Sequence, residues 1–190
     1  MTDMSRRKAI KTIGTAAVAA AVSATGVDAL ASGTSKNLED ERFNVLLING
    51  SPRPNGNTFR MLKEIASQLE KNGVQSEIVQ IGTAPVRGCI ACNQCSAQIL
   101  GKCLFDDDIC NRMIEKMSNA DALVVGSPVY YGVPAGQVLA LLQRMAYAAS
   151  DKMQRKPAAA VTVCRRGGAT SAFQTLQMPF QMLNMPIVTS

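Results

Sequence analysis

The stretch that decides the fold is Phe43-Asn-Val-Leu-Leu-Ile-Asn49, followed by Gly50-Ser-Pro-Arg-Pro-Asn-Gly-Asn57-Thr58. The first seven residues form an apolar run with β-branched content, which has the length of a buried strand. The polar loop that follows leads into apolar residues at helical spacing, which are Phe59, Leu62, Ile65 and Leu69, with Gly73 as the stop signal. The stretch therefore predicts a strand, a tight loop and a helix over 57–72.

The alternation of strand and helix continues to the end of the sequence. We predict strands over 74–81, 122–127, 158–164 and 186–189. We predict helices over 107–119, 135–149 and 170–183, the last of them kinked by Pro179. Such alternation is typical of a parallel sheet covered on both faces. We therefore expect a three-layer α/β domain with strand order 2-1-3-4-5, without the last helix of a doubly wound fold, because the sequence ends at the fifth strand.

Composition narrows the chemistry that the chain can perform. The 190 residues carry a net charge of +6 and contain no histidine. The absence of histidine excludes a Ser-His-Asp triad, an H-E-x-x-H zinc site and a two-Cys two-His finger. Residues 32–190 keep a mild basic excess, 16 Lys and Arg against 12 Asp and Glu, without a basic run interleaved with aromatic residues. We therefore expect a phosphorylated cofactor and no nucleic acid as partner.

The amino terminus has the pattern of an export signal. Arg6 and Arg7 precede an alanine-rich stretch that ends in Ala29-Leu30-Ala31, an A-x-A cleavage pattern. The segment resembles a bacterial twin-arginine signal, which exports folded, cofactor-loaded proteins; the alternative is a basic amphipathic start to an ordinary helix. We divide the chain into a signal over 1–31, a polar linker over 32–41 and one domain over 42–190. This division predicts a periplasmic protein with peripheral or no membrane contact, and the alternative is a cytoplasmic one.

The loop over 50–58 has the features of a phosphate cradle. Its glycines let the backbone approach a ligand closely, and the helix that follows points free N–H groups at the loop. Ser51, Asn57 and Thr58 offer hydroxyl and amide groups, and Arg53 adds a positive charge. The G-x-x-x-x-G-K-[ST] pattern is absent, so we do not expect nucleotide hydrolysis. The alternative interpretation is a polar turn with a good helix cap.

Two further loops are predicted to face this one from the carboxyl ends of later strands. The loop over 126–134 contains Tyr130 and Tyr131, which offer aromatic surface to a planar ring or else lie at the edge of the core. The loop over 164–168 contains Arg165, Arg166 and Gly167, and its arginines either steady an anionic ring or are solvated surface charges. The three loops together predict one ligand site at this end of the sheet.

Four cysteines lie within the insert 85–104 in the spacing C-x2-C-x2-C-x7-C, namely Cys89, Cys92, Cys95 and Cys103. Gaps of two residues let thiolates converge, as they do around iron–sulfur clusters and structural zinc. We interpret the four as ligands of a 4Fe–4S cluster; zinc, disulfides and uncoordinated thiols are the alternatives.

Other residues with ligand chemistry have plainer interpretations. Cys110 and Cys164 fall outside the cysteine pattern and are predicted to be buried small hydrophobic residues. The run 106–108, three aspartates, is interpreted as a helix start stabilised by the helix dipole rather than as a metal site.

The loops and the cysteines together carry a family resemblance. The segments Ser51-Pro-Arg-Pro-Asn-Gly-Asn-Thr58 and Gly126-Ser-Pro-Val-Tyr130, with the cysteine quartet, resemble the NADPH-dependent FMN reductase-like flavoproteins of the flavodoxin-like fold, and among them the iron–sulfur flavoproteins. The resemblance implies that the FMN phosphate is bound by Ser51, Arg53, Asn57 and Thr58. It implies that the isoalloxazine ring is flanked by Pro128, Val129, Tyr130 and Gly132. It also implies a 4Fe–4S cluster on the four cysteines.

These expectations combine into one predicted function. Tyr131, Arg165 and Gly167 are added to the predicted flavin site. We predict an FMN-dependent oxidoreductase that transfers electrons, in which the flavin carries the chemistry and no side chain is catalytic. The alternatives are a cluster-free NAD(P)H-dependent FMN or quinone reductase, a flavodoxin-type carrier, and a zinc-stabilised interaction domain.

The partners follow from the compartment. A periplasmic enzyme is predicted to take electrons from a redox protein, and a cytoplasmic one from NAD(P)H. We expect the cysteines near the surface on the flavin side of the sheet, where a partner docks. We also expect a homo-oligomer.

Overall fold

A computed structural model describes residues 43–97 and 101–189. The predicted export signal over 1–31 and the predicted linker over 32–41 lie outside the described residues. None of the helices within the described ranges is both long and apolar enough to span a bilayer.

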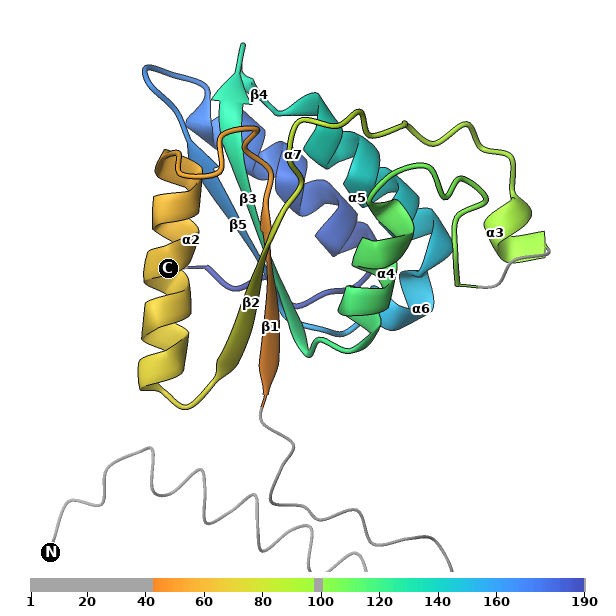
Figure 1. Ribbon diagram of the computed structural model, residues 1–190, viewed down its shortest axis with the longest axis horizontal. Helices are drawn as coiled ribbons and strands as arrows, with labels where there is room; N and C mark the ends of the chain where they lie inside the picture. Colours follow the sequence, from red (N-terminus) through yellow and green to blue (C-terminus); the bar gives the residue numbers. More distant parts are fainter. Residues whose placement is uncertain (1–42, 98–100, 190) are drawn as a thin grey trace, which may run out of the picture. The chain divides into compact units, whose positions relative to one another are not determined.

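A parallel sheet forms the centre of the domain (Figure 1). Its strands are β1 (Asn44–Asn49), β2 (Gln75–Gln80), β3 (Ala122–Tyr130) and β5 (Ala158–Val163), and they lie side by side in the order β2-β1-β3-β5. An isolated parallel bridge joins Ala158 to Ile187, where the fifth strand was predicted. Counted along the chain, the parallel segments follow the predicted order 2-1-3-4-5, with the fifth reduced to a single bridge.

The described helices are α2 (Asn57–Lys71), α3 (Gln94–Ala97), α4 (Cys110–Ser118), α5 (Gly136–Ala148), α6 (Ser150–Met153) and α7 (Ala169–Met182). The four longer ones match the predicted helices closely, and α7 runs through Pro179. A short strand, β4 (Val133–Pro134), pairs antiparallel with the end of β3. The sequence patterns did not predict β4, α3 or α6.

The strands are apolar on both faces, and each face packs against helices. Leu46 and Ile48 face a core that also holds Met113 of α4, Leu142 of α5 and Phe180 of α7. The alternate strand residues pack with Leu62 of α2 on the other face; they are Val45, Leu47 and Val124. This alternation confirms the three-layer α/β fold, because a parallel strand buried on both faces reads as a continuous apolar run.

Candidate functional site

The loop after β1 is held against the end of β3 by a close backbone approach. The N–H of Gly50 donates a hydrogen bond of 2.8 Å to the carbonyl of Gly126. A Cβ atom at Gly50 would lie 2.1 Å from Cγ2 of Val138 and 2.8 Å from the Gly126 carbonyl oxygen. Glycine is therefore required at this position, and the first two predicted ligand loops are fixed to each other.

A polar network at the carboxyl ends of β1 and β2 supports the loop after β1. The Asn49 side-chain oxygen accepts a 3.1 Å hydrogen bond from the N–H of Ser51, and its amide donates to Gln80. The Gln80 amide donates in turn to the Ser51 carbonyl. Sequence reasoning missed Asn49 and Gln80 as site residues. They are register partners at the carboxyl ends of the neighbouring strands β1 and β2, and their polar character at that edge is the signal that could have found them.

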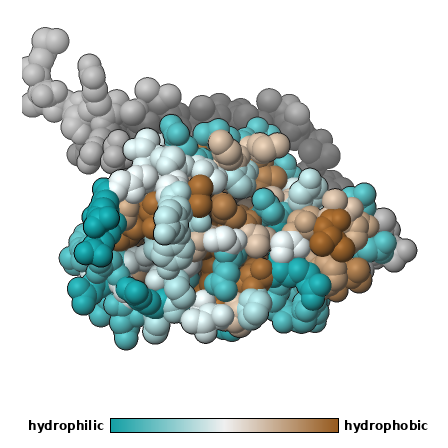
Figure 2. Space-filling view, turned by 90° about the horizontal axis from the view of Figure 1, so that it is seen from above, coloured by the Kyte–Doolittle hydropathy of each residue, from teal (hydrophilic) through white to brown (hydrophobic). Residues whose placement is uncertain are grey.

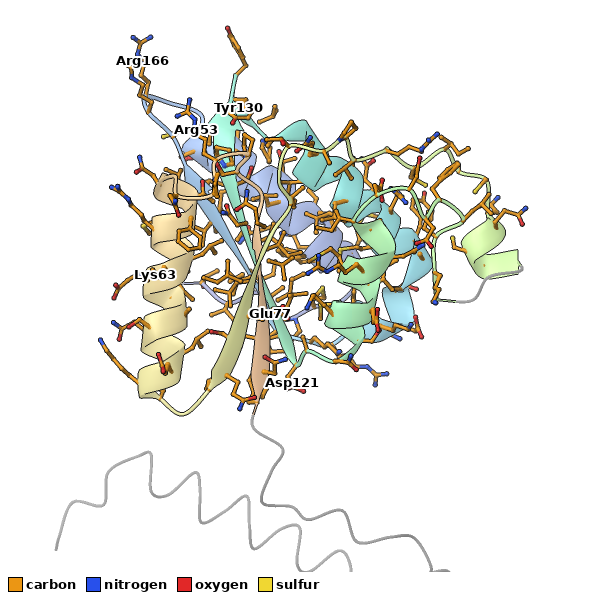
Figure 3. All side chains as sticks on the ribbon, in the orientation of Figure 1. Arg53, Lys63, Glu77, Asp121, Tyr130 and Arg166 are labelled. Atoms are coloured by element: carbon orange, nitrogen blue, oxygen red, sulfur yellow. The ribbon has the colours of Figure 1, made fainter. Side chains whose placement is uncertain are left out.

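A surface cavity of about 340 Å³ opens at the carboxyl ends of the strands. Residues from all three predicted loops line it, together with the end of β5; they are Ser51, Arg53, Gly56, Asn57, Thr58, Pro128, Val129, Tyr130, Val163, Cys164 and Arg165. Figure 3 shows Arg53 and Tyr130 together at this end of the sheet and Asp121 at the opposite end. The fold thus brings together three segments that are far apart in the sequence.

Three of the predicted flavin-site residues, Tyr131, Gly132 and Gly167, do not line this cavity. Tyr131 and Gly132 form the turn of the β3–β4 hairpin, and both have positive φ (51° and 84°), as a two-residue hairpin turn requires. The Tyr131 side chain is fully exposed to solvent. The hairpin therefore carries Tyr130 at the cavity and presents Tyr131 outward.

The hairpin is braced on both sides. The buried Ser127 hydroxyl accepts a 2.9 Å hydrogen bond from the N–H of Ala135, where α5 begins. The Ser171 hydroxyl on α7 donates a 2.6 Å bond to the Gly132 carbonyl. Gly168 has φ of 86°, and a Cβ there would lie 2.7 Å from the Gly132 Cα. The third loop and the hairpin are consequently in direct contact.

Cys164 differs from its predicted environment. It is only partly buried and lines the cavity, so its interpretation as a buried core residue was wrong. Cys110 is fully buried in the core, as predicted, and burial raises the pKa of its thiol to about 12. Cys110 therefore stays protonated at neutral pH.

The four clustered cysteines line a second, small cavity of about 20 Å³, on the side of the sheet covered by α4 and α5. All four are partly exposed and unpaired by disulfides. The Cys95 thiol donates to the Tyr147 carbonyl of α5 at 3.7 Å. Ala91 and Asn93 have positive φ values of 53° and 56°, which wind the loop around the cavity. Among the described residues, no three cysteine or carboxylate side chains converge as ligands of a single metal ion.

The surface around the cysteines is apolar. Ile90, Leu104 and Tyr147 are exposed next to the cavity that they line. Figure 2 shows hydrophobic surface gathered at the end of the domain that carries α3. The cysteines are therefore near the surface, as expected.

Arg144 of α5 joins the cysteine loop to the core. Its side chain is 1% exposed and forms an ion pair with Asp108, which is 4% exposed. Its guanidinium also donates to the Phe105 carbonyl at 2.9 Å and to the Arg87 carbonyl at 3.2 Å. The remaining contact is to the sulfur of Cys103, 3.2 Å from Nε. Burial alone would lower the pKa of Arg144, but its hydrogen bonds with Asp108 and Cys103 raise that pKa above its ordinary value.

Asp108 is the acidic partner of this arrangement. Burial alone would raise its pKa, but hydrogen bonds from the Cys110 N–H, the Arg144 guanidinium and the Arg87 N–H outweigh burial and hold the pKa below 3.8. The Cys110 contact, 3.0 Å long, lies at the start of α4, where the sequence predicted acidic stabilisation. Sequence reasoning missed Arg144, because nothing in the local pattern ties it to an aspartate 36 residues earlier.

Residues 43–190 match the family of NADPH-dependent FMN reductases. The chain belongs to this family. It is 32% identical over 147 residues to an iron–sulfur flavoprotein of Methanocaldococcus jannaschii, covering 76% of this chain and 75% of the relative. It is 33% identical over 157 residues to an iron–sulfur flavoprotein of Archaeoglobus fulgidus, covering 76% of each chain. The chain is thus an FMN-dependent oxidoreductase of the NADPH-dependent FMN reductase family.

Solved structures of other proteins have a similar fold. An NAD(P)H:quinone oxidoreductase from Methanothermobacter marburgensis superposes with a TM-score of 0.60 at 15% identity, over 78% of this chain and 81% of that one. An archaeal flavodoxin superposes with a TM-score of 0.52 at 14% identity, over 77% of this chain and 78% of the other. At these identities the likeness concerns the fold, which is flavodoxin-like.

The residues of the larger cavity fit a flavin phosphate. Helix α2 begins in the cavity wall, and Gly56 before it supplies no side-chain cap. The first N–H groups of a helix without a cap favour an anion. Ser51, Thr58 and Arg53 stand beside that helix start. FMN bound there would supply hydride and single-electron transfer.

Proposed function

We propose that this FMN-dependent oxidoreductase also carries a 4Fe–4S cluster, held by Cys89, Cys92, Cys95 and Cys103, and passes electrons between the cluster and the flavin. The observation that carries the proposal is that all four thiols line one cavity. A four-iron cluster takes one thiolate at each of four separate irons, so its ligands surround a volume rather than meet at a point. The relatives named iron–sulfur flavoproteins support the same proposal.

The flavin site is proposed in two parts. Ser51, Arg53, Asn57 and Thr58 bind the phosphate. Pro128, Val129 and Tyr130 flank the ring, and Arg165 faces it from the end of β5. Their common cavity supports this assignment. Asn49 and Gln80 act through the loop that they hold.

The electron donor is proposed to be a nicotinamide, because the family is named for NADPH. If Arg6 and Arg7 direct export, a redox protein takes its place, because NAD(P)H is not ordinarily supplied outside the cytoplasm. Cell fractionation of the full chain, with Arg6 and Arg7 changed together to Lys as the comparison, decides between the donors. Export that depends on the arginine pair supports the redox protein. A cytoplasmic protein indifferent to the change supports the nicotinamide.

The test of the proposed function is the visible spectrum and the metal content of anaerobically purified full-length protein. We expect two flavin bands over a broad iron–sulfur absorption and about four irons per chain. A yellow protein without iron that oxidises NAD(P)H is the cluster-free reductase. A colourless protein that retains zinc contradicts both the proposed cluster and the proposed flavin.

Arg53→Ala tests the phosphate site separately. Loss of one charge-assisted contact costs about 1.5–3 kcal/mol, roughly ten- to a hundredfold in FMN affinity. Arg60→Ala is the matched control, because Arg60 is an exposed arginine of α2 that does not line the cavity. Equal affinity in the two variants would mean that Arg53 does not bind the FMN phosphate.

A further inference from the structure

Cys103 is the most constrained of the four cysteines. Its backbone N–H donates to the Asn111 side chain at 2.8 Å, and its carbonyl accepts from the same side chain at 3.0 Å. Its sulfur lies 3.2 Å from Nε of Arg144. Helix α4 thus fixes the backbone of Cys103, and helix α5 fixes its sulfur.

The hydrogen bond at the Cys103 sulfur differs from those at Cys89 and Cys95. The Cys89 sulfur accepts a hydrogen bond of 3.5 Å from the N–H of Ala91, which is a neutral backbone group. The Cys95 thiol contacts a carbonyl oxygen. Cys103 instead faces a guanidinium, and a cationic N–H donor gives a stronger hydrogen bond than a neutral one.

The remaining guanidinium contacts explain why the residue is arginine. Its two terminal nitrogens are used by the Asp108 carboxylate and by the carbonyls of Arg87 and Phe105. These contacts fix the plane of the group and aim Nε at the sulfur. A lysine has a single ammonium group and cannot hold this fork.

We propose that Arg144 is a positioning residue for the iron–sulfur cluster, and that its Nε–H donates to the Cys103 sulfur and raises the reduction potential of the cluster. The inference rests on the proposed function. Hydrogen bonds to cluster sulfurs and local net charge are among the factors that set such potentials. A donor at the thiolate stabilises the reduced, more negative cluster and so favours reduction.

The first test is a redox titration of the holoprotein in a charge-neutral double variant, Asp108→Asn with Arg144→Gln. The pair removes one positive and one negative charge, so the net charge beside the cysteines is unchanged while the cationic donor is lost. We expect wild-type iron content and a shift of the cluster potential to more negative values. An unchanged potential at full iron content overturns the inference and leaves Arg144 a structural anchor.

Arg87→Gln with Asp107→Asn is the matched control, because this double variant also removes one positive and one negative charge. Arg87 lies over the Phe105 ring at 4.5 Å and pairs with Asp107 at the same loop, and its side chain is half exposed. Among the described residues, its guanidinium donates to Asp107 and to no cysteine. We expect the cluster potential of this control to equal that of the wild type. An equal shift in this control assigns the effect to the loss of any ion pair around the loop and overturns the inference.

A measurement on the unmutated protein covers the case in which the double variant does not fold. Protein labelled with ¹⁵N-arginine, reduced and examined by electron–nuclear double resonance, is expected to show a ¹⁵N coupling to the cluster that persists in Arg87→Gln. Iron present without such a coupling overturns this inference alone. Absence of iron from the wild-type protein overturns the proposed function, and the inference with it, so the two failures are distinguishable.

Discussion

The side-chain amide of Gln80 donates to the carbonyl of Ser51, so strand β2 holds the loop after strand β1 that is proposed to bind the FMN phosphate. Gln80→Leu removes this bond and leaves the Asn49 amide and the Ser51 carbonyl without their partner. Unsatisfied buried groups cost about 1–3 kcal/mol, and the apoprotein loop relieves that cost by moving away from the geometry that faces FMN. We therefore expect FMN affinity to fall by up to about 150-fold, the limit at which the whole cost falls on the bound form. Titration of apoprotein by flavin fluorescence measures the change.

Gln75→Leu is the control for Gln80, because Gln75 is exposed at the other end of the same strand. Its FMN affinity is expected to equal that of the wild type. Equal losses in the two variants would show that β2 acts only through general stability.

Gly50→Ala is expected to lower the free energy of unfolding by about 1–3 kcal/mol, because the new methyl group overlaps Val138 and a backbone carbonyl. Urea unfolding of the apoprotein measures the loss. Gly136→Ala is the paired variant, since a Cβ at Gly136 meets no atom within 4 Å at the start of α5. It should be neutral or slightly stabilising. A neutral Gly50→Ala would mean that the two loops are not in contact.

The lowered pKa of Asp108 predicts that the free energy of unfolding falls in acid. Its folded pKa lies below 3.8, the value expected of the unfolded chain, so its ion pair contributes fully above that pH and is lost as pH falls through the folded pKa. The difference in unfolding free energy between the wild type and Asp108→Asn should be constant above about pH 5 and shrink below about pH 4. Urea unfolding of both proteins from about pH 5 down to about pH 2.5 measures this difference.

Asp107→Asn serves as the reference for Asp108. Asp107 pairs with Arg87, but both side chains are at least half exposed. Exposed pairs contribute about 0–1 kcal/mol, so this variant should differ little from the wild type at any pH. A pH-independent difference for Asp108→Asn would contradict the lowered pKa.

Gly168→Ala tests the contact between the third loop and the hairpin. Its positive φ costs a non-glycine residue about 1–2 kcal/mol, and the added methyl group would meet the Gly132 Cα. We expect reduced stability and faster hydrogen exchange at the hairpin. The neighbouring Gly167→Ala meets no atom within 4 Å and should behave like the wild type. Identical exchange in both variants would contradict the bracing role of Gly168.

The sequence was sufficient for the long helices and the parallel strands, because apolar periodicity reports which face of an element is buried. The sheet order was predicted from the alternation of strands and helices, which is typical of a doubly wound fold. It could not reveal β4, which has two residues, or α3 and α6, which have four each, because such segments are too short to show a period. The predicted phosphate-loop residues meet in one cavity because they follow a single strand. Tyr131, unlike Tyr130, does not line this cavity, because it occupies the exposed turn of the hairpin, where its φ is positive.

The residues that act across the fold were beyond sequence reasoning. Arg144 lies in an apolar helix pattern, where a lone arginine usually marks a solvated position. Its buried carboxylate partner is 36 residues away and becomes visible only when α4 and α5 pack together. Gln80 and Asn49 likewise meet only through strand register.

Helix α5 fixes the distance between the proposed flavin cavity and the cysteine cavity. It begins directly after the hairpin that lines the proposed flavin cavity, and eight residues later Arg144 reaches the cysteines, about 12 Å along the helix axis at 1.5 Å per residue. The two cavities share no lining residue. Electron tunnelling slows steeply with distance, and a rigid helix keeps that distance constant. In the proposed two-cofactor enzyme, helix α5 then fixes the rate of electron transfer between the cluster and the flavin. The turnover rate is set by how fast the electron donor and the electron acceptor reach their sites.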